Sequence, residues 1–171
     1  SAPLVVKKDP NSAGSEADIA AQFEMLQDLR RDLDSASDMV NQIESIRAQL
    51  YQLTNTAGAS DATVKSAADD LDKKLIDVED DLIQRRLTGQ GQDTVRWPPK
   101  LLSKLGYLNG GLSSSDFPPT NQHREVHAMF KQQLATIKQR FDAVMNQDVG
   151  AFNKLLKDRN IGNVITRSSS P

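Results

Sequence analysis

The chain has 171 residues, of which 37% are hydrophobic and 26% are charged, and its net charge is −2. These values are typical of one folded domain with a modest core, and so small a net charge excludes long-range attraction to nucleic acid or anionic lipid. The absence of cysteine excludes disulfides, thiolate nucleophiles and cysteine-ligated metals, and no apolar run approaches the roughly 20 residues that a membrane span needs.

Residues 1–14 are predicted to be an extended linker or the end of a preceding domain. They contain a short apolar run, Leu4 to Val6, and a turn at Asp9-Pro10. They lack the positive-then-apolar organisation of a signal peptide. Ser15 precedes Asp18 by three residues, so Ser15 is expected to cap the first helix.

The first helix is predicted to run from Ser15 to about Asn55, because apolar residues recur there in helical steps. The small polar run from Ser35 to Asp38 leaves open whether this helix is continuous or kinked. Gly58 is expected to end it. The predicted stripe comprises Ile19, Phe23, Leu26, Leu33, Val40, Ile43, Leu50 and Leu53.

A second helix is predicted from Ser60 or Asp61. The acidic residues between Asp69 and Asp81, Glu79 among them, are assigned to its solvated face, because a continuous helix cannot wrap a cation. Arg85 and Arg86 are placed in its last turn, where the helix dipole favours cations. Its apolar residues alternate in steps of four and three, which indicates one narrow seam: Val64, Ala68, Leu71, Leu75, Val78 and Leu82.

A third helix is predicted after Pro118-Pro119, capped by Thr120 or Asn121. Its exposed positions are basic or amide-bearing, which suits a place beside the acidic second helix. Asp148 is expected to cap a short fourth helix that ends near Asn160, and residues 161–171 are expected to be a disordered tail. The stripe of the third helix comprises Val126, Phe130, Leu134, Ile137, Phe141 and Val144.

Together these elements predict an all-α fold: an antiparallel three- to four-helix bundle over residues 15–160. A structured insertion, residues 88–119, separates the second and third long helices. Connections longer than about 12–15 residues are uncommon unless they carry function or substructure. Trp97-Pro98-Pro99 is expected to open a short helix within the insertion. That helix is expected to end at Gly110-Gly111, with an apolar face of Leu101, Leu102, Leu105 and Leu108.

The insertion has three interpretations. It is either a lid packed over one end of the bundle, a docking surface for another domain or protein, or the wall of a small-molecule pocket. The lid is the favoured interpretation. Tryptophan and tyrosine are enriched at interface anchors, so the docking surface comes second and the pocket last. The candidate residues are Trp97, Leu101, Leu105, Tyr107 and Phe117.

His123 and His127, with Glu125 between them, form the one candidate catalytic or metal centre. A metalloprotease helix carries its acid directly after the first histidine, as H-E-x-x-H, whereas this chain reads H-R-E-V-H. No third ligand is evident, so a surface or capping role is favoured over zinc. The sequence also lacks a nucleophile elbow and a phosphate loop. A non-enzymatic chain without a cofactor is therefore expected.

The expected partner is the preceding domain of the same chain or another protein. Basic residues are not interleaved with aromatic ones, and no helix has a lysine-rich amphipathic face, so neither nucleic acid nor a membrane surface is expected. A monomer is favoured. The alternative is a homo-oligomerising coiled coil, which would follow if the first helix overhangs its partners.

Three stretches resemble the C-terminal helical region of large bacterial proteins with a sortilin-like or sialidase-like Asp-box repeat β-propeller, often labelled glycosyl hydrolases. These stretches are LVVKKDPNS, RRLTGQGQDTVRWPPKLLSKLGYLNGGLSSSDFPPTNQHREV and AFNKLLKDRNIGNVI; D-T-V-R-W-P-P-K and D-F-P-P-T are the most specific parts. The resemblance implies an accessory domain that follows a propeller in an exported protein, periplasmic or extracellular. It implies no catalytic residue here, since a hydrolase site would lie in the propeller and this chain has no Asp-box.

Overall fold

The computed structural model describes residues 2–55, 61–114 and 116–164, and over these ranges the chain is helical, without a strand. The prediction of an all-α fold is confirmed. None of the described helices combines the length and the apolar character that crossing a bilayer requires. The elements are α1 (Glu16–Asn55), α2 (Ala62–Leu82), α3 (Asp93–Arg96), α4 (Leu101–Leu112), α5 (Asn121–Ala143), the π-helix η1 (Val144–Val149) and α6 (Gly150–Asp158).

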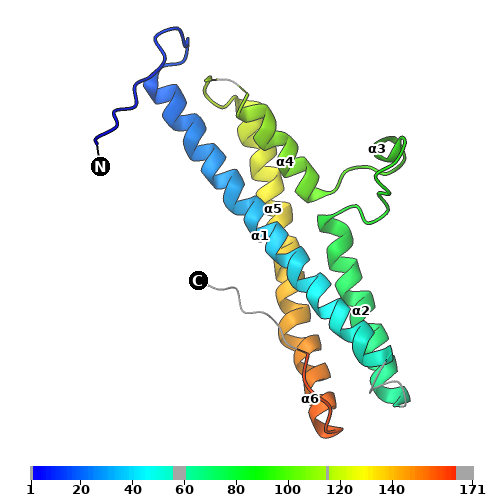
Figure 1. Cartoon of the computed structure of the whole chain (residues 1–171). Coiled ribbons are helices and arrows are strands. Elements are labelled where there is room, and N and C mark those ends of the chain that lie inside the picture. Colours follow the sequence, from blue (N-terminus) through cyan, green and yellow to red (C-terminus); the bar gives the residue numbers. More distant parts are fainter. Residues whose placement is uncertain (1, 56–60, 115, 165–171) are drawn as a thin grey trace.

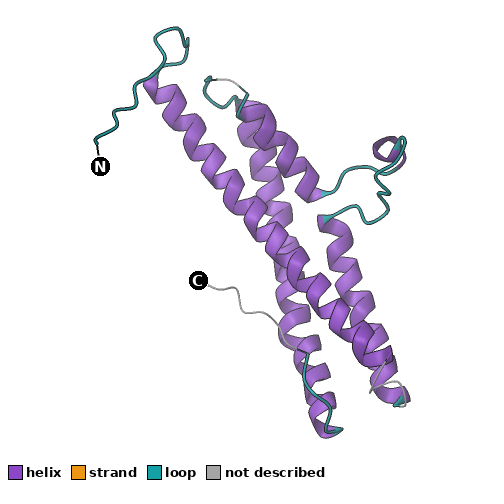
Figure 2. Ribbon diagram, in the orientation of Figure 1, coloured by secondary structure: helices purple, strands orange, loops and turns teal. Residues whose placement is uncertain are grey.

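The helices pack side by side into an elongated molecule whose longest element is α1 (Figure 1). α4 packs against the N-terminal half of α1 and α2 against its C-terminal half, and both run antiparallel to it. α5, η1 and α6 follow one another along the remaining side. Figure 2 shows that the other described segments are loops, and that the longer ones are the segment before α1 and the connection between α2 and α4.

A single apolar core runs between these helices. The seam predicted for α2 is confirmed, because its six apolar residues are all buried. α2 starts where Asp61 caps it: the Asp61 carboxylate accepts hydrogen bonds from the backbone N–H groups of Thr63 and Val64, at 2.9 and 3.2 Å. Such a cap satisfies amides that have no partner within the helix.

α1 is one continuous helix through Ser35–Asp38, where Ala36 is fully buried. Its predicted cap is confirmed: Ser15 Oγ accepts from the Asp18 backbone N–H (3.1 Å), and the Asp18 carboxylate accepts from the Ser15 N–H (3.0 Å). This reciprocal pair is a capping box. Gly58 lies outside the described residues.

The buried stripe at the start of α1 differs from the predicted one by one position. Phe23 is 59% exposed, whereas the neighbouring Gln22 is buried. The Gln22 side-chain amide donates to the Leu112 carbonyl oxygen at 2.7 Å. That carbonyl lies at the end of α4, where no helical N–H is available. A polar side chain therefore occupies the seam because it supplies the missing donor.

Two predictions for α2 are wrong. Glu79 does not lie on the solvated face but is 1% exposed, beside Val78 in the seam. Arg85 and Arg86 are not in the last turn, because α2 ends at Leu82. Arg85 instead folds back, and its Nε lies 3.1 Å from the Glu79 carboxylate.

The long C-terminal helix differs from prediction at two places. Val126 is 36% exposed, whereas the next residue, His127, is buried. No capped fourth helix begins at Asp148, because α5 passes through η1 directly into α6. The π-turn brings residues five apart onto one face, so Val144 and Val149 are both buried. Asp148 instead accepts from Lys74 Nζ on α2 (2.5 Å).

α6 ends as predicted near Asn160, which adopts a left-handed conformation with φ of 57°. The start of the predicted tail is packed, however. Val164 is buried, its N–H donates to Asn153 Oδ1 (2.8 Å), and its carbonyl accepts from Asn153 Nδ2 (3.2 Å). Residues 165–171 lie outside the described part.

The segment predicted as an insertion, 88–119, has two different parts. α4 continues through Gly110-Gly111 to Leu112 and packs lengthwise against α1 and α5, so it does not form a lid over one end. Its core residues are Leu101, Leu105, Leu108 and Leu112. Residues 83–100, here named the α2–α4 loop, project from the packed helices, with α3 at the tip (Figure 1).

Candidate functional site

The five residues predicted as a docking surface do not lie together. Leu101 and Leu105 are 3% and 0% exposed and belong to the core, so they cannot contact a partner in this structure. Tyr107 is 87% exposed on the outer face of α4, and Phe117 is exposed in the connection to α5. Trp97 is half-buried at the base of the α2–α4 loop.

The base of the α2–α4 loop is held by contacts between its two arms. The Arg86 guanidinium lies over the Trp97 ring, 4.7 Å from the ring centroid, in a cation–π arrangement. Gln84 Nε2 donates to the Pro98 carbonyl oxygen at 3.2 Å. These contacts join residues on either side of α3, so the loop leaves and re-enters the helices at one place.

The tip of the α2–α4 loop is organised by the Asp93 carboxylate. Its Oδ2 accepts from the Thr88 N–H (2.6 Å), the Thr88 hydroxyl (3.0 Å) and the Gly89 N–H (2.9 Å). The Thr88 backbone hydrogen bond is the largest of the causes that lower the pKa of Asp93. Gly89 and Gly91 have φ of +76° and +62°, values that favour glycine.

This organised loop presents apolar side chains to solvent. Val95 is 78% exposed, and Leu87 is also exposed. Because the carboxylate of Asp93 fixes the turn between them, their positions are defined by hydrogen bonds and not by apolar packing. Trp97 is the residue of this segment predicted to contact a partner, and Leu87 and Val95 are not predicted. A signal was available, because the Gly89-Gln90-Gly91 turn lies between these two apolar residues.

The two histidines have separate structural roles. His123 Nδ1 accepts from the Thr120 N–H (3.3 Å) while Thr120 Oγ1 accepts from the His123 N–H (3.2 Å), which caps α5. His127 Nε2 lies 2.7 Å from Asp32 Oδ2 on α1, with both side chains largely buried. Within the described ranges, no group of three histidine, aspartate or glutamate side chains is placed to hold a metal ion.

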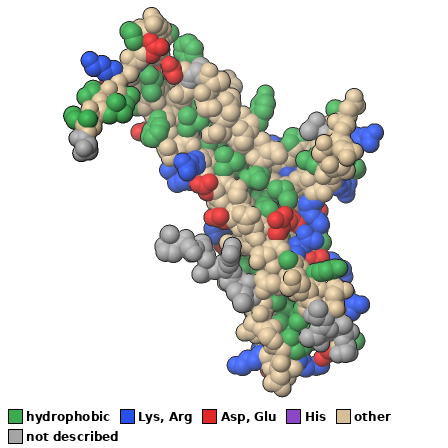
Figure 3. Space-filling view, viewed as in Figure 1, with side chains coloured by type: hydrophobic (Ala, Val, Ile, Leu, Met, Phe, Trp, Pro, Cys, Tyr) green, Lys and Arg blue, Asp and Glu red, His purple; other side chains and the backbone are tan. Residues whose placement is uncertain are grey.

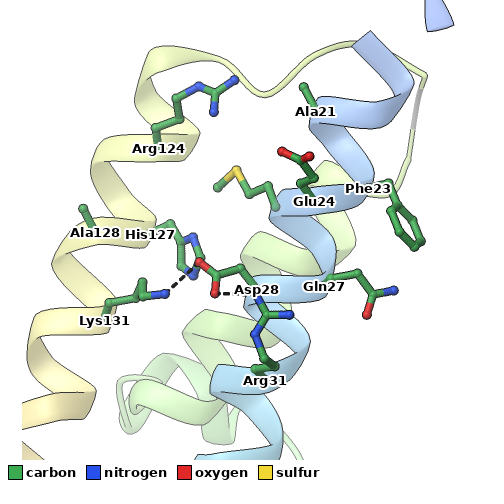
Figure 4. A pocket seen from close by; sticks show the side chains of 11 residues that line it. Ala21, Phe23, Glu24, Gln27, Asp28, Arg31, Arg124, His127, Ala128 and Lys131 are labelled. Atoms are coloured by element: carbon green, nitrogen blue, oxygen red, sulfur yellow. Dashed lines mark hydrogen bonds and ion pairs between the residues drawn. The ribbon is translucent and has the colours of Figure 1, made fainter. Parts of the chain in front are cut away.

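A groove of about 660 Å³ separates α1 from the first turns of α5 (Figure 4). Its charges are largely matched across the gap. Asp28 on α1 accepts from Lys131 Nζ on α5 (2.7 Å) and from Arg31 (3.0 Å). The hydrogen bond from Lys131 is the largest cause of the lowered pKa of Asp28. Arg124 and Glu24 extend into the groove from opposite walls, so both signs line it (Figure 4).

A second groove, of about 540 Å³, lies between the first turn of α4 and α5 and is named the α4–α5 groove. Arg140 on its wall pairs with Asp81 and donates to the Asp77 carbonyl oxygen (3.2 Å). Lys100 and Lys104 also line it, and neither makes an ion pair with any described residue. This groove therefore carries an excess of positive charge.

A buried charge cluster joins α1, α2 and the start of the α2–α4 loop. The Glu79 carboxylate lies 2.7 Å from Arg47 Nη1 and 3.1 Å from Arg85 Nε, and Arg47 Nε also lies 2.8 Å from Asp72. Burial is the main influence on Glu79 and raises its pKa, while the two arginines act in the opposite direction. Glu79 follows Leu75 by four residues, a spacing that could have placed it in the seam.

Charges of both signs are interspersed over the face of the molecule in Figure 3, with apolar patches between them. Smaller hollows lie between α1 and α2, lined by Arg47 and Tyr51, and between α2 and α6, lined by Leu71 and Phe152. Neither protein-family models, nor curated proteins, nor solved structures yield a match to this chain.

Proposed function

We propose that this chain is a non-catalytic helical interaction module that docks onto a partner through the α2–α4 loop. In this proposal the helices form an antiparallel bundle, with α2 and α4 sharing one side of α1 and α5. The structured insertion is then reduced to residues 83–100. The observation that carries the proposal is that this loop projects from the helices, is fixed by hydrogen bonds and exposes Val95 and Leu87.

A fixed apolar loop suits docking for an energetic reason. Binding by a flexible loop costs the entropy of ordering it, whereas a loop already held in its bound shape avoids much of that cost. The Asp93 carboxylate and the Arg86–Trp97 contact supply that order without a partner. Exposed apolar side chains on an ordered projection are then free to be buried by another surface.

The roles of the two histidines support a non-catalytic assignment. His123 is used as a helix cap, and His127 is paired with Asp32. The sharpest check is zinc titration of the protein and of its His127→Ala variant. We expect no stoichiometric binding by either; tight binding by the parent that is lost in the variant would favour the metal-dependent hydrolase alternative.

We also propose, from the sequence resemblance alone, that the module follows a propeller domain in a larger exported protein. The partner is then that preceding domain or a second protein. Light scattering at increasing concentration tests the oligomeric state. A monomer is expected, whereas a stable dimer would favour the homo-oligomerising scaffold.

The docking surface is tested by placing a photo-crosslinking amino acid at Val95, with Tyr51 as a matched site. Tyr51 is a similarly exposed apolar residue on α1, remote from the loop. The captured protein is identified by mass spectrometry and purified, and its affinity is measured by calorimetry. The double variant Leu87→Ser, Val95→Ser is expected to bind at least about tenfold more weakly, since each side chain contributes about 1 kcal/mol or more at such an anchor.

Tyr51→Ser is expected to bind like the parent, and all variants should retain the same thermal unfolding midpoint. Equal affinity for the parent and the double variant would remove the α2–α4 loop from the interface. Equal loss in the double variant and in Tyr51→Ser would indicate a non-specific apolar effect.

A further inference from the structure

The α4–α5 groove carries two lysines whose charge is not offset. Lys100 is the N-cap of α4, and its carbonyl oxygen accepts from the Lys104 N–H at 3.1 Å, so the two residues lie one turn apart and line the same groove. Like charges at this spacing repel one another, and neither lysine has an ion-pair partner among the residues described. An anionic group placed between them would relieve that repulsion.

The start of α4 adds to the same positive potential. The backbone at Lys100 begins the helix, and no side chain caps the first turn of amide groups. Uncapped N–H groups at a helix start carry partial positive charge. The dipole alone would not define a site, but here it has the same sign and position as the two lysines.

The opposite wall, on α5, offers groups suited to a peptide backbone. Gln132 and Gln133 are exposed, and their amides are free of any described partner. Each amide can both donate and accept a hydrogen bond. The Thr136 hydroxyl donates instead to the Gln132 carbonyl of its own helix (3.1 Å). Met129, about half exposed, ends this wall as an apolar contact.

The two grooves differ in how their cations are paired. In the groove between α1 and the first turns of α5, Asp28 pairs with both Lys131 and Arg31, and Glu24 lies on the wall opposite Arg124. In the α4–α5 groove, Asp81 pairs with Arg140, whereas Lys100 and Lys104 have no ion-pair partner among the described residues. Charge complementarity therefore favours an acidic occupant for the α4–α5 groove and gives no such preference for the other.

We propose that the α4–α5 groove binds an acidic peptide segment of the partner protein. Its carboxylates lie against Lys100 and Lys104, and one apolar side chain lies against Met129. Met129 and Arg140 are 11 positions apart on α5, which at 1.5 Å per residue is roughly 16 Å. An extended segment of about five residues covers that length. This inference rests on the proposed docking function, because Lys100 is the last residue of the α2–α4 loop and one partner can contact both the loop and the groove.

The test is fluorescence polarisation of the intact chain with fluorescein-labelled short peptides that combine glutamates with one leucine. A matched set carries glutamine in place of each glutamate. The acidic set is expected to bind, more tightly at low salt than at physiological salt. The variant Lys100→Glu, Lys104→Glu is expected to weaken this binding at least about tenfold, because it reverses both contacts. The control Lys65→Glu, Lys154→Glu makes the same change of net charge at exposed positions on α2 and α6.

Three results would overturn the inference: equal binding of the glutamine set, equal loss in the two charge-reversal variants, or tighter binding of an RNA oligomer of matched charge through the same lysines. Thermal unfolding of each variant excludes loss of the fold as the cause. Failure here is separable from failure of the docking proposal. If the partner's affinity depends on Leu87 and Val95 but not on Lys100 and Lys104, the loop docks and the groove does not bind.

Discussion

Glu79 is the one buried carboxylate among the described residues, and its charge depends on Arg47 and Arg85. Burial of a charge is costly unless it is paired, so removal of one arginine leaves Glu79 with too little compensation. The same burial raises the pKa of Glu79 above its ordinary value of 4.5. Its contribution to stability is therefore present below that ordinary value and is lost as the pH rises through the raised pKa.

We expect Arg47→Leu to lower the free energy of unfolding by about 2–4 kcal/mol at neutral pH. The loss should shrink toward pH ~4, where Glu79 becomes protonated and no longer needs a cation. Urea unfolding of the parent and the variant at neutral pH and at pH ~4 measures this difference in the free energy of unfolding. Arg30→Leu is the control, because the Arg30–Asp34 pair is exposed and spans 3.8 Å. A loss no larger than that of Arg30→Leu, expected below about 0.5 kcal/mol, would show that the cluster contributes little.

At the scale of elements, the α2–α4 loop keeps its shape through polar contacts at its tip and its base. Three hydrogen bonds converge on Asp93 Oδ2, and the nearby Val95 and Leu87 side chains are exposed. The order of the loop and the stability of the helices are consequently separate properties.

Asp93→Ala is expected to loosen the loop without unfolding the helices. Trypsin should then cut at Arg86 or Arg96 about threefold faster or more, because local opening governs cleavage there. The global thermal midpoint should change little. Asp69→Ala, at an exposed position on α2, serves as the control and should leave the cleavage rate unchanged. A lowered midpoint with cooperative loss of helix would mean that the loop supports the core.

The sequence predicts the helices best where the interactions that define them are between residues close together in the chain. The cap at Ser15 is predicted from Asp18 three residues later, and the structure has it. The sequence leaves two candidates for the start of each of the next two long helices, Ser60 or Asp61 and Thr120 or Asn121, and the structure has Asp61 and Thr120 as the caps. The steps of four and three in α2 likewise define its seam without knowledge of the neighbouring helices. Such signals identify where each helix starts and which face it buries.

The predictions are wrong where a contact with a residue far away in the sequence determines which side chain is buried. Gln22 is buried because the Leu112 carbonyl needs a donor, and His127 because Asp32 accepts it from 95 positions away. Nothing near Lys100 in the sequence indicates that α5 forms the other wall of its groove. The candidate site therefore depends on how α4 packs, and its Gly110-Gly111 pair suggested a shorter helix than the one observed.

At the scale of the whole molecule, ion pairs link the first two long helices to the last. Asp28 pairs with Lys131, Lys74 with Asp148, and Asp61 with Arg159. The last pair joins the start of α2 to the end of α6, since Asp61 is also the cap of α2. Asp61 thereby connects local helix capping with the closure of one end of the molecule.

This arrangement makes stability sensitive to acid. The pKa values of Asp18, Asp28, Asp61 and Asp93 are all lowered from 3.8, and the backbone hydrogen bond from Val64 is the largest cause at Asp61. A lowered pKa contributes stability that is present above 3.8 and is lost as the pH falls through the folded value. The temperature of the unfolding midpoint is therefore expected to decrease when the pH drops below ~4. Glu79 has the opposite effect, because protonation of its buried carboxylate favours the folded state.

The Asp61→Asn variant isolates one part of this dependence. Asparagine keeps the helix cap but not the charge, so the midpoint should be lowered at neutral pH, where Asp61 is ionised and paired with Arg159, and should stay close to that of the parent in acid. Its side chain does not titrate, so the decline in acid should be shallower than in the parent. Parallel curves for the two proteins, measured by circular dichroism from pH ~2 to ~7, would contradict a role for the Asp61 charge.

The placement of α2 and α4 along the same side of α1 and α5 also determines where this chain can change in length. A residue inserted into α1 would rotate every later side chain by about 100° and misalign its seam. Residues added between α2 and α4 would shift no seam, and doubling a loop costs only about 0.6 kcal/mol. The α2–α4 loop is thus the position at which a segment for a new partner can be grafted while the packed helices remain unchanged.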